Sequence, residues 1–189
     1  DELRKTHPPK HEQGFTIFFT GLLGAGKATI ANALRVKLLE MGGRPITLLD
    51  GKKVQKYLSS ELDASKEDKE INIKRIGFVA SEITKAGGVA ICTPIAPYAE
   101  VRQRVKDMVA PNGGFLEVYV STPIDVCEER DTRGLYEMAR SWSVEDFTGI
   151  SEAYEAPQDP DLEIDMQDCS PDEAAQRILI KLEKHGYIK

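Results

Sequence analysis

The sequence predicts an α/β fold, a three-layer sandwich in which a parallel five-stranded sheet carries helices on both faces and a lid segment. Three observations predict it. Short apolar runs alternate with amphipathic runs of helical period along the 189 residues. Glycine pairs at 42–43 and 87–88 mark helix ends. The first apolar run leads into a glycine-rich turn that ends in a lysine.

The glycine-rich turn predicts a phosphate-binding loop and makes the fold P-loop NTPase-like. Gly21, Gly24, Gly26 and Lys27 fit the pattern G-x-x-x-x-G-K, in which backbone N–H groups surround a phosphate at the start of a helix. We predict that ATP contacts the whole stretch, which consists of Gly21, Leu22, Leu23, Gly24, Ala25, Gly26, Lys27, Ala28 and Thr29.

The residue after the lysine departs from this pattern. A Ser or Thr hydroxyl normally binds Mg²⁺ there, and this chain has Ala28. Thr29 is one position on, turned by about 100° around the helix. We therefore expect no direct side-chain ligand for the metal, with Asp50 as a ligand through water.

The other elements follow in order. An amphipathic run from Ile30 to Leu39 predicts the first helix. Residues 45–50 read as a buried strand that ends in Asp50, which either orients metal-bound water or caps the next helix. The later expected elements are helices over 53–62 and 66–86, a strand over 89–93, a loop over 94–98, a helix of about ten residues with Arg102 and Arg104, a strand over 115–120, a helix around 124–130, a strand over 162–165 and a helix over 171–185.

The segments between these elements define the domain. Residues 1–13 are polar with a Pro-Pro pair and read as a linker or docking arm of a longer polypeptide, so 14–189 form one domain. Asp131–Ile150 is rich in charge and glycine, which suits a mobile lid that brings arginines to a phosphoryl group. The alternative is that this segment is an ordinary surface loop.

Composition excludes several classes of protein. A net charge of −6 argues against a nucleic-acid partner. Cys92, Cys127 and Cys169 show no C-x-x-C spacing, which indicates reduced thiols and neither disulfides nor a zinc site. No run approaches ~18 apolar residues, so we expect no membrane partner and a cytoplasmic location.

Several motifs together resemble a known family. Asp50-Gly51, Pro97-Tyr98, Arg133-Gly-Leu-Tyr136 and Phe147-Thr-Gly-Ile150 occur in the order seen in adenylylsulfate kinase, and the resemblance runs from Gly14 to Ile188. It implies transfer of the γ-phosphate of ATP to the 3′-hydroxyl of adenylyl sulfate with Mg²⁺, commonly by a homodimer. The first residues are similar to the junction of bacterial fusions, which implies an oligomer with a preceding ATP sulfurylase domain.

The resemblance also implies roles for individual residues. It places Lys27, Asp50 and Lys52 in catalysis, and Arg130 and Arg140 of the lid at ATP. The residues that it implies for adenylyl sulfate, or its phosphorylated product, are Asp50, Lys69, Asn72, Arg75, Ile95, Tyr98, Arg133, Leu135 and Phe147.

The chain departs from the family at five positions: Ala28, Lys52, Gln55, Ala64 and Ala99. Two lost arginine contacts and one lost stacking face remove roughly 4–9 kcal/mol of binding if they add. The resemblance therefore implies a weakened kinase. The alternative is a silent regulatory domain that binds adenylyl sulfate, phosphoadenylyl sulfate or ATP and controls an attached sulfurylase.

Overall fold

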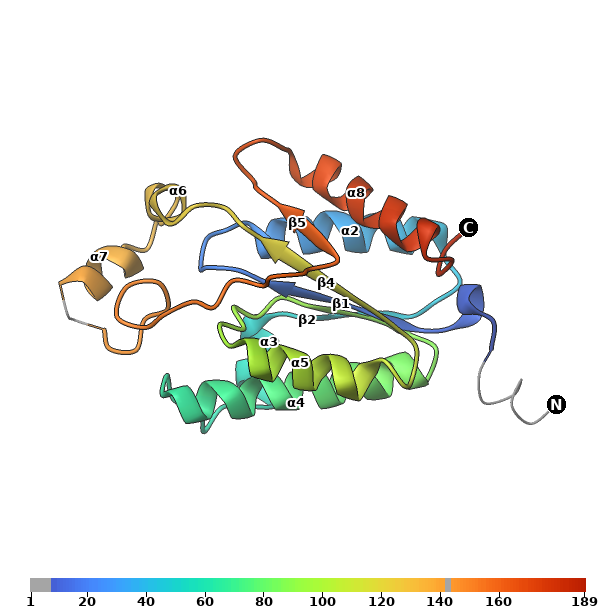
Figure 1. The fold of residues 1–189 in the computed structure, drawn as a ribbon, viewed down its shortest axis with the longest axis horizontal. Helices are drawn as coiled ribbons and strands as arrows, with labels where there is room; N and C mark the ends of the chain where they lie inside the picture. The colour runs from blue at the N-terminus through green and yellow to red at the C-terminus, as the bar shows by residue number, and fades with distance from the viewer. Residues whose placement is uncertain (1–7, 142–143) are drawn as a thin grey trace.

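A parallel five-stranded sheet forms the middle of the molecule, as predicted (Figure 1). The computed structural model describes residues 8–141 and 144–189, so the parts of the predicted arm and lid at 1–7 and 142–143 lie outside the described residues. The strands are β1 (Phe15–Thr20), β2 (Ile46–Leu49), β3 (Val89–Cys92), β4 (Gly114–Val120) and β5 (Leu162–Ile164). Their order is β2-β3-β1-β4-β5, with every pair parallel.

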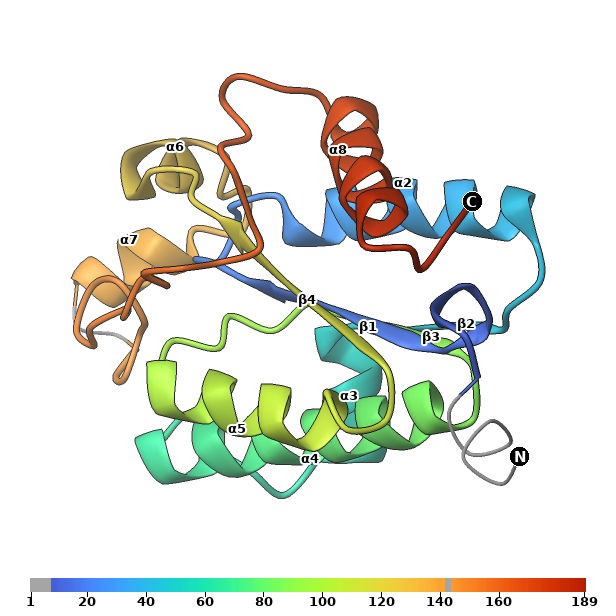
Figure 2. The same cartoon turned by 45° about the vertical axis from the view of Figure 1, so that its right-hand side comes forward.

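Helices cover both faces of the sheet (Figure 2). On one face lie α2 (Lys27–Met41) and α8 (Pro171–Lys184), and on the other lie α3 (Gly51–Tyr57), α4 (Lys66–Lys85) and α5 (Ala99–Val109). Each face has its own apolar core, and all six residues of the central strand β1 are buried between the two. The predicted three-layer sandwich is therefore confirmed.

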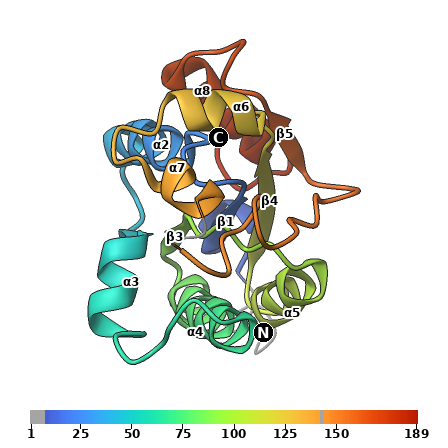
Figure 3. The ribbon, with the colours of Figure 1, turned by 90° about the vertical axis from the view of Figure 1, so that its left-hand side faces the viewer.

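The two remaining helices lie beyond the carboxyl ends of the strands (Figure 3). They are α6 (Ile124–Glu129) and α7 (Leu135–Arg140), and the second belongs to the segment predicted as a lid. The phosphate loop after β1 and the loop after β3 start at the same edge of the sheet. This is the edge at which open α/β sheets bind ligands.

Two elements differ from the sequence prediction. The helix expected over 53–62 spans 51–57, because the Asp50 side chain accepts the Lys53 N–H at 2.9 Å and starts the helix earlier. It ends early because the N–H groups of both Leu58 and Ser59 bond to the Val54 carbonyl. Helix α7 was not predicted, since its six residues are too few for a clear periodic pattern.

The visible end of the arm contacts the body of the domain. Lys10–Glu12 form a short 3-10 helix, η1, and the Arg44 guanidinium donates hydrogen bonds to the carbonyls of His11 and Gln13. None of the helices in the described ranges is long and apolar enough to cross a membrane.

Candidate functional site

The phosphate loop depends on glycines at positions that other residues do not tolerate. Gly24 and Gly26 have φ angles of +79° and +109°, in the left-handed region. A Cβ at Gly26 would also lie 2.9 Å from the Cγ atom of Met166. The sequence therefore folds here as the motif requires, with the loop running directly into α2.

Hydrogen bonds from neighbouring elements hold the loop from outside. The Tyr136 hydroxyl donates to the Leu23 carbonyl, and the Thr122 hydroxyl donates to the Ala25 carbonyl, each at 2.7 Å. These bonds use carbonyl oxygens and no N–H group of the loop. The N–H groups at the start of α2 have no acceptor within the helix, so they remain available for an anion.

Lys27 is buried beneath this loop with 7% of its surface exposed. Its Nζ donates to the carbonyls of Gly21 and Leu22 at 2.7 and 2.8 Å. Burial lowers the pKa of Lys27 from 10.5 to about 8. The ammonium is thus poorly solvated, and a phosphate oxygen would be a better partner for it than two neutral carbonyls.

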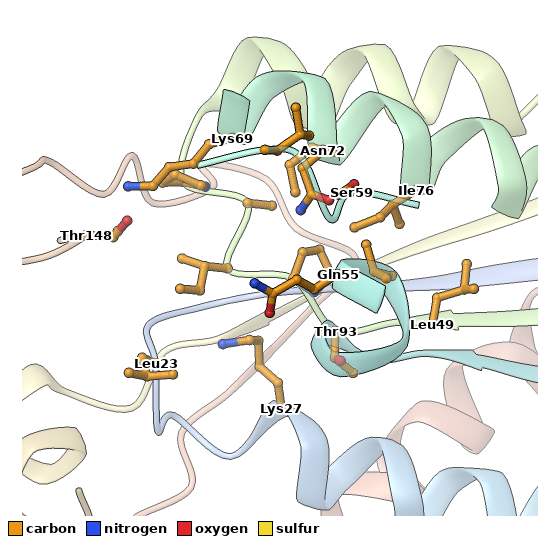
Figure 4. A pocket seen from close by; sticks show the side chains of 18 of the residues that line it. Leu23, Lys27, Leu49, Gln55, Ser59, Lys69, Asn72, Ile76, Thr93 and Thr148 are labelled. Carbon is orange, nitrogen blue, oxygen red and sulfur yellow. The ribbon is translucent and has the colours of Figure 1, made fainter. Parts of the chain in front are cut away.

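A cavity of about 390 Å³ opens beside Lys27 (Figure 4). Its walls come from the phosphate loop, α3, α4, the loop over 93–97 and Thr148. Five of the predicted site residues line it: Leu23, Lys27, Lys69, Asn72 and Ile95. The structure therefore brings predicted ATP-binding and predicted acceptor-binding residues into one cavity.

Other predicted acceptor residues lie at its margin. Asp50 caps α3 and sits between Leu49 and Gly51, which line the cavity, and Lys52 is exposed on the first turn of that helix. The Arg75 guanidinium is held by the Leu58 carbonyl and the Glu61 carboxylate, which raises the pKa of Arg75.

The predicted lid arginines do not line the cavity. Arg140 pairs with Glu128, which raises the pKa of Arg140, and Arg130 donates to the Met166 carbonyl at 3.1 Å. Arg133 is exposed.

Two further predicted site residues of the lid lie in or against α7. Leu135 begins α7. Phe147 packs edge-to-face on Tyr136, with the two ring centroids 5.0 Å apart. Through the Tyr136 hydroxyl this aromatic pair connects to the phosphate loop.

Glu152 forms an ionic cluster at the cavity that the sequence did not reveal. Its carboxylate accepts hydrogen bonds from the Lys69 ammonium and the Tyr98 hydroxyl. Burial and the Glu152 contact raise the pKa of Tyr98. A lone glutamate in a polar segment carries no motif, so only the fold could identify it.

Arg102 is a second residue that the sequence did not assign to the site. Its buried guanidinium donates to the carbonyls of Ala96 and Glu155. Ala96 has φ of +48°, which is uncommon for a residue other than glycine. Arg102 therefore fixes the loop over 93–97 to the segment that follows the predicted lid.

No group of three or more His, Cys, Asp or Glu side chains that could hold a metal occurs within the ranges 8–141 and 144–189. Ala28 supplies no oxygen, and one oxygen of Asp50 already accepts the Lys53 N–H. Mg²⁺ commonly keeps several waters and uses one or two carboxylates with substrate phosphates. The residues present fit an ion held in that way.

A family model described as "Adenylylsulphate kinase" matches residues 13–165. Among curated relatives, a sulfate adenylyltransferase of Phaeosphaeria nodorum is 46% identical over 186 residues, which are 98% of this chain and 32% of that protein. The chain thus spans about a third of the length of the curated relatives that it matches.

Two solved structures are similar along nearly the whole chain. The Mycobacterium tuberculosis APS kinase CysC, in complex with AMPPNP and APS, is 37% identical with a TM-score of 0.86, covering 93% of this chain and 99% of that one. A hexameric APS kinase from Thiobacillus denitrificans is 46% identical with a TM-score of 0.80, covering 100% of this chain and 32% of that one.

Proposed function

Since this chain belongs to the adenylylsulphate kinase family, we propose that it transfers the γ-phosphate of ATP to the 3′-hydroxyl of adenylyl sulfate. One observation carries the proposal. The buried ammonium of Lys27 and the predicted acceptor residues Lys69 and Asn72 line the same cavity of about 390 Å³. A phosphate donor and an anionic acceptor bound there would meet.

The phosphate loop would hold ATP. The N–H groups at the start of α2 would donate to phosphate oxygens, and the Lys27 ammonium would exchange its two carbonyl partners for a phosphate oxygen. Arg140 would reach the nucleotide only after the segment over 131–150 moves, because it now pairs with Glu128, and Arg130 would have to leave the Met166 carbonyl. This segment therefore acts as the lid.

The acceptor would occupy the cavity between α4 and the loop over 93–97. Lys69 offers a cation and Asn72 an amide, and Ile95 contributes an apolar wall. The substrate contacts at the margin would be Asp50, Arg75, Tyr98, Arg133, Leu135 and Phe147. The three that belong to the lid, Arg133, Leu135 and Phe147, would position the acceptor and exclude water.

Mg²⁺ would bind through the nucleotide's phosphates and water, with Asp50 as an outer ligand. When bound, the ion offsets negative charge on the phosphates. The chain's own catalytic groups are Lys27, which places an ammonium at the transferring phosphoryl group, and Asp50 and Lys52 at the start of α3. Transfer would depend mainly on positioning and electrostatic stabilisation.

The domain would act as a homodimer in the cytoplasm, within a larger fusion with an ATP sulfurylase. The curated relatives, sulfate adenylyltransferases about three times as long, support the fusion, and one similar APS kinase that is hexameric supports assembly into an oligomer.

A coupled assay with ATP, Mg²⁺ and adenylyl sulfate tests the proposal, with phosphoadenylyl sulfate identified as the product. We expect turnover by the wild-type chain and faster turnover by Ala28→Ser, which would add a hydroxyl ligand for the metal. Lys37→Ala, on the far part of α2, serves as a control that leaves the rate unchanged.

Similarity to kinases along nearly the whole chain favours turnover over the silent regulatory domain. Tight ATP binding with no phosphoadenylyl sulfate formed would reverse that preference. Absence of both binding and turnover would refute nucleotide chemistry at this site altogether.

A further inference from the structure

Thr122 is a buried polar residue to which the sequence prediction gave no role. It lies between the end of β4 and the start of α6, and only 2% of its surface is exposed. Its hydroxyl donates to the Ala25 carbonyl at 2.7 Å and accepts the Met166 N–H at 3.1 Å. This single hydroxyl therefore joins the phosphate loop to the segment that follows β5.

The bond to Ala25 fixes the direction of one peptide group in the phosphate loop. The peptide between Ala25 and Gly26 is trans, so its C=O and N–H point in opposite directions. Thr122 holds the C=O on the outer side of the loop, and the Gly26 N–H therefore faces the inner side. That N–H directly precedes Lys27, where a bound phosphate would accept hydrogen bonds from the backbone.

The bond to Met166 fixes a residue that supports the same loop from a second direction. A Cβ placed on Gly26 would lie 2.9 Å from the Met166 Cγ atom, so this side chain packs against the peptide that Thr122 orients. The Met166 carbonyl also accepts the Arg130 guanidinium at 3.1 Å, and Arg130 is a proposed contact of ATP. Both hydrogen bonds of the Thr122 hydroxyl thus lead to the nucleotide side of the site.

The acceptor side of the site depends on other elements. Lys69 and Asn72 belong to α4, and Ile95 belongs to the loop over 93–97. In the described part of the chain, neither hydrogen bond of the Thr122 hydroxyl goes to these elements. A change at Thr122 should therefore affect the phosphate donor and leave the acceptor contacts in place.

We propose that Thr122 is a positioning residue for ATP, whose hydroxyl orients the Ala25–Gly26 peptide and Met166 so that the loop meets the nucleotide's phosphates. Threonine suits this role because its branched side chain has few rotamers and holds the hydroxyl in one direction. The inference rests on the proposed function and adds to it a residue that serves the donor and not the acceptor.

Thr122→Val tests the proposal, because valine keeps the shape of threonine and removes the hydroxyl. Thr16→Val is the matched control, since Thr16 is buried in β1 and its hydroxyl shares a 2.7 Å hydrogen bond with the Thr84 hydroxyl near the end of α4. Calorimetry measures the dissociation constants for ATP and for adenylyl sulfate. Steady-state kinetics measure KM for each substrate, and thermal unfolding without ligand measures stability.

We expect Thr122→Val to raise the dissociation constant and KM for ATP about tenfold, which corresponds to about 1.4 kcal/mol. Its constants for adenylyl sulfate should stay within about twofold of wild type. Thr122→Ser restores the hydroxyl and should return ATP binding to within about threefold of wild type.

The control separates positioning from stability. Both valine variants lose a buried hydrogen bond, so the unfolding temperature should fall in each. Thr16→Val should nevertheless bind ATP and adenylyl sulfate as wild type does. Because the two variants carry the same kind of structural damage, reduced stability alone cannot produce a selective loss of ATP binding.

Several results would overturn the positioning role. They are unchanged ATP affinity in Thr122→Val, equal weakening of both substrates, and failure of Thr122→Ser to restore ATP binding. If Thr122→Val does not fold, Thr122→Ala is measured against the same expectations, and failure of both to fold assigns Thr122 a purely structural role. A wild-type chain that does not bind ATP overturns the proposed function as well, whereas normal wild-type turnover beside an unaffected Thr122→Val removes only this inference.

Discussion

Removing the negative charge of Glu152 should strengthen binding of the acceptor. Glu152 and Lys69 form an ion pair at the cavity, with side chains 16% and 20% exposed. An anionic acceptor that approaches Lys69 must share it with this carboxylate. The Glu152→Gln variant keeps an oxygen to accept the Tyr98 hydroxyl and removes only the charge.

Coulomb's law gives the size of the effect. A unit negative charge of the acceptor at about 6 Å from the carboxylate is repelled by about 3 kcal/mol at an effective dielectric constant of about 20. Glu152 also orders the Lys69 side chain. Without that order, fixing Lys69 on the acceptor costs conformational entropy, which offsets part of the gain in binding free energy. We expect a net gain of about 1–2 kcal/mol, or about five- to thirtyfold tighter binding.

Titration calorimetry with adenylyl sulfate measures this change at low and at moderate salt. Glu145→Gln is the control, because Glu145 lies close to Glu152 in the sequence, is exposed, and its substitution changes the net charge equally. It should bind within twofold of wild type. If Glu152→Gln binds adenylyl sulfate no better than wild type, Glu152 does not compete with the acceptor for Lys69 and the electrostatic reasoning is refuted.

Three further predictions concern the loop and its supports. The Lys27 pKa of about 8 lies below its ordinary 10.5, so between these two pH values the unfolded chain binds more protons than the folded chain and the free energy of unfolding rises with pH. In urea unfolding, the free energy of unfolding of wild type should increase by about 2 kcal/mol from pH 7.5 to 9.5, and Lys27→Met should lack this increase. Equal pH dependence in the two chains would contradict this assignment to Lys27. Gly26→Ala should lower the free energy of unfolding by at least about 1 kcal/mol and weaken ATP binding, because a φ of +109° is unfavourable for alanine. Adding Met166→Ala should restore only part of the lost stability, and complete restoration would assign the effect to the contact with Met166 instead of to the backbone. Arg102→Met should lower the free energy of unfolding by about 3–5 kcal/mol, since the buried Ala96 carbonyl and the partly buried Glu155 carbonyl lose a charged donor. Arg104→Met, which loses one exposed ion pair, should cost less than about 0.5 kcal/mol, and similar costs for the two variants would argue against a special role for Arg102.

The sequence predicted the parts of the fold that follow from strong local patterns. The parallel sheet, the glycine-rich turn between β1 and α2, and the long helices α2, α4 and α8 all have clear periods or glycine signals, and all are confirmed as structural elements. The N-terminal end of α8 shows why, because Ser170 and Glu173 form a capping box that is visible in the sequence.

The network around the cavity could not be predicted in this way. Glu152 meets Lys69 across 83 residues, and Arg102 meets Glu155 across 53, so neither contact leaves a local pattern. The boundary of α3 failed for a different, local reason, because the Asp50 cap starts the helix at Gly51. Side-chain roles that depend on distant partners required the structure.

The carbonyl of Ile95 accepts both the Gly21 N–H at 3.2 Å and the Thr20 hydroxyl at 2.7 Å. The Gly21 bond ties the strand end that leads into the phosphate loop to the loop over 93–97 through main-chain atoms alone. Under the proposed function, mutation of the Ile95 side chain would change acceptor preference while this main-chain tie to the nucleotide loop is retained. Such a joint lets one half of the site diverge during evolution without disturbing the other.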